Sequence, residues 1–219
     1  MSPIRVLIAD DHTIVREGLV SLLQSEKDIA LVGQAQDGRE AVKLALEQEP
    51  DVVVMDITMP TLNGLEAARQ IRAQKPQIKI VVLSIHTEAG FVNSALRVGA
   101  NGYVLKSAAY DELKQAILTT ARGDVYLSPA ISTMVVEGYV SNVVLREKET
   151  AYESLTPRQR ELLQLIAEGH TRREIASMLG ISPKTVSRHR EDLMHNLGIT
   201  DDASLVRFAL DMGIIDASF

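Results

Sequence analysis

The stretch Asp51-Val-Val-Val-Met-Asp56-Ile-Thr-Met-Pro60 decides the fold of this 219-residue chain. Three valines and a methionine between two aspartates, with a proline soon after, are typical of a short buried strand in a parallel sheet. Such a strand places Asp56 at the carboxyl edge of the sheet, where open α/β folds bind their ligands. An aspartate here can also simply begin a loop, because Asp is a common turn residue. If Asp56 belongs to a ligand site, other strands should bring reactive residues to the same edge. If it only begins a loop, they need not.

The first 122 residues alternate predicted strands with predicted helices. The strands cover residues 5–9, 29–35, 51–55, 79–83 and 102–105, and the helices cover residues 12–23, 39–49, 65–73, 88–98 and 110–122. This alternation predicts an α/β fold with a doubly wound five-stranded parallel sheet. We expect the flavodoxin-like strand order 2-1-3-4-5, in which strands 1 and 3 lie side by side.

Four of the five predicted strands end in a polar residue that can take part in chemistry. These residues are Asp10 with Asp11, Asp56, Ser84 and Lys106. Parallel strands end at one edge of a sheet, so we expect these side chains to lie together. Clustered carboxylates repel one another unless a cation joins them, and oxygen ligands without His or Cys suit a hard ion such as Mg²⁺. The pattern therefore predicts a Mg²⁺ site at which Asp56 carries a phosphoryl group, with Lys106 as a positive charge and Ser84 as a donor.

Residues 4–122 resemble the receiver domain of two-component response regulators. The matching positions are the pair Asp10-Asp11, the segment Met55-Asp56-Ile-Thr-Met-Pro60, Gly64, Ser84, Tyr103 and Lys106. Many receivers have proline after the lysine, whereas this chain has Ser107. The cis peptide bond is disfavoured without proline, so the usual cis geometry is not assumed here, and the conformation of the Lys106-Ser107 bond stays open.

The resemblance implies a role for each matching residue. Asp56 is implied to accept a phosphoryl group from a histidine kinase. Mg²⁺ is implied to be held by Asp11, Asp56 and the backbone carbonyl of Thr58, with Asp10 acting through water. Two further residues are implied to form a switch pair that moves toward the phosphoryl group, namely Ser84 and Tyr103.

Residues 155–219 predict a small all-α domain of four helices. Capping boxes begin the first two helices at Thr156 and Thr171, and Ser182-Pro183 begins the third. The short turn Gly180-Ile-Ser-Pro183 joins the second and third helices, which predicts a helix-turn-helix. Five basic residues and one acidic residue lie between positions 171 and 190, a basic patch in a chain of net charge −6.

The third of these helices has two distinct faces. On a wheel of about 100° per residue, one face carries Val186, Arg190, Leu193 and Leu197, and the opposite face carries Lys184, Arg188, Glu191 and His195, with Ser187 at its edge. Arg can read guanine and Glu can accept from cytosine in the major groove. The alternative is an ordinary solvated face, because exposed charges are common.

The motifs of this domain resemble the LuxR-type DNA-binding domain, and the whole chain is similar to response regulators of the NarL/FixJ class. The resemblance implies that the third helix reads double-stranded DNA and that the fourth helix dimerises. Leu205 and Phe208 are candidates for that seam or for the core, and a receiver face is a further candidate for the homodimer contact. The candidate DNA contacts are Lys184, Thr185, Ser187, Arg188, Arg190 and Glu191.

The expected domains are a receiver over residues 1–123, a linker with a short helix over 124–154, and the helix-turn-helix domain over 155–219. Cysteine is absent, and we find neither a signal peptide nor an apolar run of the roughly 20 residues that a membrane span needs. We therefore expect a soluble cytoplasmic protein without a membrane partner.

These features predict a phosphorylation-controlled, DNA-binding transcription regulator, not an enzyme. Phosphate on Asp56 is expected to change dimerisation or domain packing and so promoter binding. One alternative is a phospho-dependent adaptor that binds only protein. A second is a metal-dependent phosphohydrolase of the haloacid-dehalogenase type, but that type needs a carboxylate two positions after the nucleophile, where this chain has Thr58.

Overall fold

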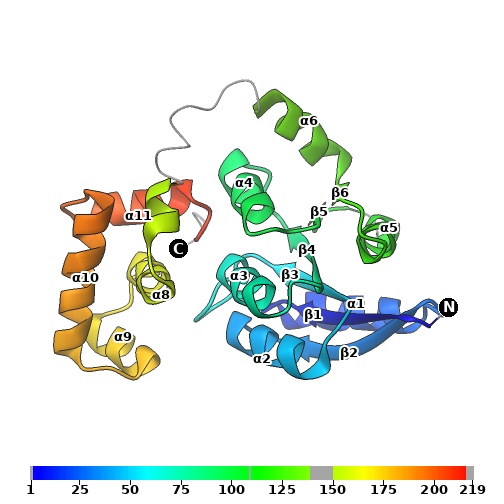
Figure 1. The fold of residues 1–219 in the computed structure, drawn as a ribbon, viewed down its shortest axis with the longest axis horizontal. Helices are drawn as coiled ribbons and strands as arrows, with labels where there is room; N and C mark the ends of the chain where they lie inside the picture. The colour runs from blue at the N-terminus through cyan, green and yellow to red at the C-terminus, as the bar shows by residue number, and fades with distance from the viewer. Residues whose placement is uncertain (1, 109, 139–149, 216–219) are drawn as a thin grey trace. The chain divides into compact units, whose positions relative to one another are not determined.

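The computed structural model describes residues 2–108, 110–138 and 150–215. The chain forms two compact units, Met1–Tyr139 and Val140–Phe219 (Figure 1). The predicted domain boundaries at residues 123 and 155 stay predictions. Residues 139–149 of the predicted linker lie outside the described residues.

A parallel sheet of six strands forms the centre of the first unit. Its strand order is β2-β1-β3-β4-β5-β6. The strands are β1 (Ile4–Ala9), β2 (Ile29–Ala35), β3 (Val52–Asp56), β4 (Lys79–Ser84), β5 (Gly102–Leu105) and β6 (Tyr126–Leu127). The predicted fold and the order of the first five strands are confirmed, and the two-residue β6 extends the sheet beyond β5.

Helices cover both faces of this sheet (Figure 1). They are α1 (Thr13–Gln24), α2 (Gly38–Gln48), α3 (Gly64–Gln74), α4 (Ala89–Arg97), α5 (Tyr110–Ala121) and α6 (Pro129–Gly138). One hydrophobic cluster joins the sheet to side chains of α1 and α5, and another joins it to α2, α3, α4 and α6. The sheet is therefore wound on both faces, as the alternation predicts.

Strand β3 is buried along its whole length because it contributes to both clusters. Successive side chains of a strand point to opposite faces. Val53 and Met55 accordingly pack with α2 and α3, whereas Val52 and Val54 pack with α1 and α5. A continuous apolar run is what a central parallel strand requires, and it ends at Asp56.

The segment after α5 packs on the first unit. Ser128 N–H donates to the carbonyl of Tyr103, and Ser128 Oγ accepts from Leu105 N–H at 3.3 Å. Ile131 of α6 is fully buried in the cluster that covers α2, α3 and α4. Part of the predicted linker thus contributes to the core of this unit.

The second unit is a bundle of helices. A helical turn covers residues 150–154, followed by α8 (Pro157–Ala167), α9 (Arg172–Leu179), α10 (Pro183–Leu197) and α11 (Asp202–Asp211). Both predicted capping boxes are present, at Thr156 and Thr171. Among the residues that the structure describes, no helix is long and apolar enough to span a membrane.

Tyr152 belongs to the core of the second unit. Its side chain is 7% exposed, and the guanidinium of Arg160 lies over its ring at 5.3 Å from the centroid. Arg160 also donates to the carbonyl of Glu153 at 3.0 Å. The turn over residues 150–154 is therefore tied to α8 by a cation–π contact and by a hydrogen bond from the Arg160 side chain to a backbone carbonyl.

Candidate functional site

The register of the sheet aligns the strand ends at one edge. Ala9 of β1 lies opposite Met55 of β3, so the residues that follow them, Asp10 and Asp56, are neighbours. Ser84 lies opposite Leu105, which directly precedes Lys106. The parallel pairing thus brings together residues that are up to 96 positions apart in sequence. This agrees with the prediction that polar residues at the ends of parallel strands lie at one edge of the sheet.

Lys106 joins two of the carboxylates at this edge. Its Nζ lies 2.6 Å from Asp56 Oδ2 and 2.8 Å from Asp10 Oδ2. Asp10 and Asp56 are 1% and 2% exposed, whereas Asp11 is 31% exposed at the rim. We call Asp10, Asp11, Asp56 and Lys106 the acidic pocket. The structure brings together all four residues that the sequence predicts for the charged part of the site.

The acidic pocket alters the ionisation of its central residues. Burial raises the pKa of the Asp56 carboxyl from its ordinary 3.8 to about 6, with Lys106 acting against this rise and Asp10 and Asp11 adding to it. Burial alone lowers the pKa of Lys106, but the nearby carboxylates of Asp56 and Asp10 outweigh it and raise that pKa. Lys106 therefore stays positively charged, while the ionised form of Asp56 is costly unless a further cation joins it.

His12 is a member of this cluster that the sequence reasoning missed. Its Nδ1 lies 2.8 Å from Asp11 Oδ1 and 4.0 Å from Asp56 Oδ2. The sequence reasoning considered only oxygen ligands and did not include this imidazole. The only signal in the sequence is its position directly after Asp11, and that position alone does not show where the imidazole points.

The loop from β3 to α3 fits closely around Asp56. A Cβ on Gly64 would lie 1.8 Å from the carbonyl oxygen of Asp56, so only glycine fits at the start of α3. Gly64 N–H donates to the carbonyl of Ile57 at 2.7 Å, and Asn63 caps the helix by accepting from Glu66 N–H. Thr58 is half-buried in this loop, two residues beyond Asp56.

Ser84 and Tyr103 lie beside the pocket, and both are fully buried. Ser84 Oγ accepts from His86 N–H at 3.2 Å, and Tyr103 Oη donates to the carbonyl of His86 at 2.9 Å. Burial raises the pKa of the Tyr103 hydroxyl, which therefore remains a hydrogen-bond donor. The His86 ring stacks on Phe91 with centroids 3.8 Å apart. Both predicted switch residues thus contact the same loop residue.

The sequence leaves open the conformation of the peptide bond between Lys106 and Ser107. No cis peptide bond occurs in the described ranges 2–108, 110–138 and 150–215. Ser107 is exposed.

The second candidate site is the helix-turn-helix formed by α9 and α10. Gly180 ends α9 in the left-handed region, with φ 64°, which favours glycine. Ser182 then caps α10 by accepting from Thr185 N–H at 3.1 Å. Val186 and Leu193 of α10 are buried at 1% and 0% exposure, so the opposite face of the helix points outward.

The six predicted DNA contacts fall into two groups. Lys184, Arg188 and Glu191 are exposed on α10. The others are partly buried and bonded within the unit. The hydroxyls of Thr185 and Ser182 share a hydrogen bond of 2.8 Å. Arg172 Nη1 donates to Ser187 Oγ at 3.1 Å, and Arg190 Nη2 donates to Asp202 Oδ1 at 2.6 Å.

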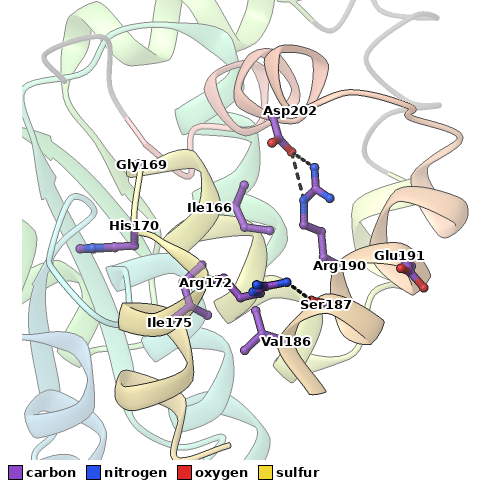
Figure 2. A pocket seen from close by; sticks show the side chains of 10 residues that line it. All are labelled: Ile166, Gly169, His170, Arg172, Ile175, Val186, Ser187, Arg190, Glu191 and Asp202. Carbon is purple, nitrogen blue, oxygen red and sulfur yellow. Dashed lines mark hydrogen bonds and ion pairs between the residues drawn. The ribbon is translucent and has the colours of Figure 1, made fainter. Parts of the chain in front are cut away.

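The residues of the last two bonds line an open hollow of about 750 Å³ beside α10 (Figure 2). Arg172, at the start of α9, reaches across to Ser187, while Arg190 turns toward Asp202 at the start of α11 (Figure 2). The helical wheel placed Arg190 on the buried face and did not identify Asp202 as its partner. It also missed Arg172, which lies on another helix.

The candidates for a dimer seam lie in the core of the second unit. Leu205 and Phe208 of α11 are 0% and 6% exposed and pack with α8 and α10 side chains. Their burial supports the alternative that they are core residues. A shallow hollow of about 340 Å³ lies between the 150–154 turn, the end of α10 and the outer side of α11, where Arg207 is exposed.

Comparison with known protein families matches both units. Residues 6–118 match the family described as the response regulator receiver domain. Residues 153–209 match the family described as bacterial regulatory proteins of the luxR family. The first match contains the acidic pocket, and the second contains the helix-turn-helix.

Two curated relatives match almost the whole chain. The transcriptional regulatory protein MctR of Rhizobium johnstonii is 38% identical over 212 residues, which are 97% of this chain and 95% of the relative. The response regulator GacA of Pseudomonas aeruginosa is 36% identical over 215 residues, covering 98% of this chain and 99% of the relative.

Solved structures of response regulators are similar to part or nearly all of this chain. A LuxR-family two-component response regulator from Aurantimonas sp. has a TM-score of 0.61 and 39% identity, covering 64% of this chain and 100% of that chain. RcsB from Salmonella enterica serovar Typhimurium, bound to promoter P1flhDC with the phosphomimetic BeF3−, has a TM-score of 0.58 and 26% identity. That match covers 96% of this chain and 99% of that chain.

Proposed function

Because this chain belongs to the two-component response regulators that join a receiver domain to a LuxR-type DNA-binding domain, we propose that Asp56 is its phosphoacceptor. The protein is a phosphorylation-controlled, DNA-binding transcription regulator of the NarL/FixJ class. The observation that supports Asp56 is its position: a buried carboxylate at the end of the central strand, 2.6 Å from Lys106 and beside two further carboxylates.

The proposed transfer takes the phosphoryl group from a histidine kinase. An oxygen of Asp56 attacks the phosphorus, the bond from phosphorus to the imidazole nitrogen of the kinase breaks, and an aspartyl phosphate forms. Lys106, whose ammonium lies between Asp10 and Asp56, donates hydrogen bonds and compensates negative charge. The side chain of Ser84 offers a hydroxyl beside the acceptor.

Thr58 has no carboxylate, so the side chain two residues after Asp56 cannot act as a general acid or base. We therefore propose a switch rather than an enzyme with turnover.

The donor set of the acidic pocket fits a divalent cation. Carboxylate oxygens are the ligands that Mg²⁺ prefers, and the three carboxylates of the pocket have one lysine to balance them. We propose Asp10, Asp11, Asp56 and the backbone carbonyl of Thr58 as the residues that hold it, with Asp10 acting through water. Mg²⁺ bound there supplies charge compensation for the transferred phosphoryl group.

Ser84 and Tyr103 are the proposed switch pair. Both contact His86 in the loop after β4, so a movement of Ser84 toward a new phosphoryl group also changes the surroundings of the Tyr103 hydroxyl. The proposed result is a shift of the β4–α4 loop that alters dimerisation or domain packing.

The proposed partner of the second unit is double-stranded DNA. Lys184, Arg188 and Glu191 are exposed on one helix and are proposed to contact bases or phosphates, while Thr185, Ser187 and Arg190 support the helix-turn-helix from within. We propose a homodimer, through α11 or a receiver face, that binds two half-sites about one helical turn apart. We propose a cytoplasmic location, where such a partner is found.

Phosphorylation of the full chain with a radiolabelled small phosphodonor, acetyl phosphate, in Mg²⁺ tests the acceptor. We expect label on the wild type and on Asp51→Asn, and none on Asp56→Asn. Asp51 is the matched control because it carries a carboxyl group just before the opposite end of the same strand. Equal labelling of the two variants contradicts the proposal.

A further inference from the structure

The imidazole of His12 lies against the carboxylates of the acidic pocket. Its Nδ1 is 2.8 Å from Asp11 Oδ1, 3.5 Å from Asp10 Oδ1 and 4.0 Å from Asp56 Oδ2. Each of these four residues offers one atom that can bind a metal ion, and these four atoms all lie within 4.8 Å of one another. The cluster therefore contains a nitrogen that can bind a metal ion, in addition to the carboxylate oxygens of Asp10, Asp11 and Asp56.

The separations match those of ligands around one metal ion. At a metal–ligand distance of about 2.1 Å, adjacent ligands of an octahedron are about 3 Å apart and opposite ligands are about 4.2 Å apart. The three distances from His12 Nδ1, between 2.8 and 4.0 Å, fall close to this range. One ion can therefore contact the nitrogen and the carboxylates of Asp11 and Asp56 after only small side-chain adjustments, with Asp10 acting through water.

The backbone of His12 is held in place by its neighbours. Its N–H donates to Asp10 Oδ1 at 2.8 Å, and Arg16 Nη1 donates to the Asp10 carbonyl at 2.6 Å. His12 occupies the N-cap position of α1, where Ser, Thr, Asp or Asn normally satisfies the helix N-terminus. Its side chain makes no capping bond and turns toward the carboxylates instead.

The charges of the pocket also favour a cation near His12. Lys106 contacts Asp10 and Asp56 through their Oδ2 atoms, whereas the contacts of His12 with Asp10 and Asp11 run through Oδ1. The 4.0 Å approach of His12 to Asp56 is to Oδ2, the oxygen that also binds Lys106. The histidine side chain is 63% exposed, so an ion reaches this side of the pocket from solvent. Three carboxylates carry more negative charge than one lysine compensates.

We propose that His12 is an additional ligand of the divalent ion, and that it makes this pocket bind first-row transition ions such as Mn²⁺, Co²⁺ or Zn²⁺ in preference to Mg²⁺. Imidazole is a common ligand for transition ions, whereas Mg²⁺ is held almost entirely by oxygen. The inference rests on the proposed receiver site and specifies which ions that site accepts.

Binding of Co²⁺ and of Mg²⁺ to the full chain tests this inference. Co²⁺ binding is followed by its visible absorption, and Mg²⁺ binding by calorimetry, for the wild type and for His12→Phe. We expect the variant to bind Co²⁺ at least about tenfold more weakly and to lose the spectral contribution of a nitrogen ligand. Its affinity for Mg²⁺ is expected to change by less than about twofold, because the oxygen ligands remain.

His195→Phe is the matched control, because His195 is an exposed histidine of the second unit. It should leave both affinities unchanged. Equal Co²⁺ binding by the wild type and His12→Phe overturns the inference, and so does tighter binding of both ions by the variant, which means that the imidazole competes for the ion's place. Wild-type protein that binds neither ion contradicts the proposed metal site itself, and the inference falls with it.

Discussion

Asp56 is a buried carboxyl group whose ionised form destabilises the metal-free fold. Burial is the main cause of its pKa of about 6, compared with an ordinary value of 3.8. The folded state therefore holds a proton more tightly than the unfolded state does. This proton stabilises the folded state fully below about pH 3.8, and the stabilisation is lost as the pH rises through about 6. The total loss at neutral pH is about 3 kcal/mol of the free energy of unfolding.

Asp56→Asn should therefore stabilise the metal-free protein at neutral pH. We expect its free energy of unfolding to exceed that of the wild type by about 1–3 kcal/mol at pH 7, with little difference at pH 4. The gain stays below the full value because Lys106 loses an ion pair. Urea unfolding across this pH range measures the difference.

Added Mg²⁺ serves as the control for this comparison. Saturating Mg²⁺ should stabilise the wild type more than Asp56→Asn, because a ligand that binds only the folded state stabilises it by mass action. A variant that is less stable than the wild type at pH 7 without metal, with an unchanged pH dependence, would contradict the assigned electrostatics.

Arg188 and Arg190 are two residues apart on α10 and have different surroundings. Arg188 is exposed, whereas Arg190 donates to Asp202 Oδ1 through Nε and Nη2. Arg188→Ala is expected to weaken specific DNA binding by about 1–3 kcal/mol without loss of stability. A duplex selected from a random library by the wild-type protein provides the probe.

Arg190→Ala is the matched variant for Arg188→Ala. It should cost less than about 1 kcal/mol of folding stability, since its ion pair with Asp202 is largely exposed. Its effect on discrimination between bases should be smaller than that of Arg188→Ala. If both variants weaken DNA binding equally, the division of the helix into exposed and supporting residues is wrong.

The charged residues of the pocket could be predicted from the sequence because each follows a strand. Strand ends in a parallel sheet share one edge, so the order of the residues alone makes Asp10, Asp56 and Lys106 expected neighbours. His12 could not be predicted in this way, because its contact with Asp11 depends on the side-chain direction in the loop. The bond between Arg172 and Ser187 joins two helices, and a wheel of either helix does not contain it.

At the scale of elements, the β3–α3 connection determines where Asp56 lies. Gly64 begins α3 so close to the end of β3 that a Cβ would overlap the Asp56 carbonyl oxygen. Because the obstacle is backbone, a rotamer change cannot relieve it. The position of the acceptor therefore depends on a glycine that has no chemical role of its own.

Gly64→Ala should displace the end of β3 and weaken the fold. We expect a loss of about 1–3 kcal/mol in the free energy of unfolding, with slower phosphorylation by acetyl phosphate. Gly18→Ala is the control, because Gly18 lies within α1 and a Cβ added to it would have no neighbouring atom within 4 Å. Alanine there should stabilise the protein by about 0.5–1 kcal/mol. Similar effects of the two substitutions would show that the tight approach at Gly64 is unimportant.

The elements that the sequence did not predict are short, or they join a core through one side chain only. Strand β6 consists of Tyr126 and Leu127, too few residues for an alternating pattern to appear. Tyr152 lies in a polar stretch, and its place in the second core depends on contacts with Arg160, eight residues later. The long elements carried clear periodic patterns, and their predicted bounds agree with the structure to within one or two residues.

At the scale of the whole molecule, the two units have separate cores and separate chemistry. The acidic pocket lies in the first unit and the exposed face of α10 in the second. Control of DNA binding by phosphate therefore requires a coupling free energy between two distinct sites. Such couplings typically change affinity by about 5–150-fold.

The central claim is that phosphate on Asp56 controls DNA binding by the same chain. The most direct test measures the dissociation constant of the full chain for the selected duplex in Mg²⁺, with and without acetyl phosphate. We predict that the phosphodonor increases the affinity of the wild type and of Asp51→Asn by at least about fivefold and leaves Asp56→Asn unchanged. An unchanged affinity of the phosphorylated wild type, or an equal increase for Asp56→Asn, would contradict this account.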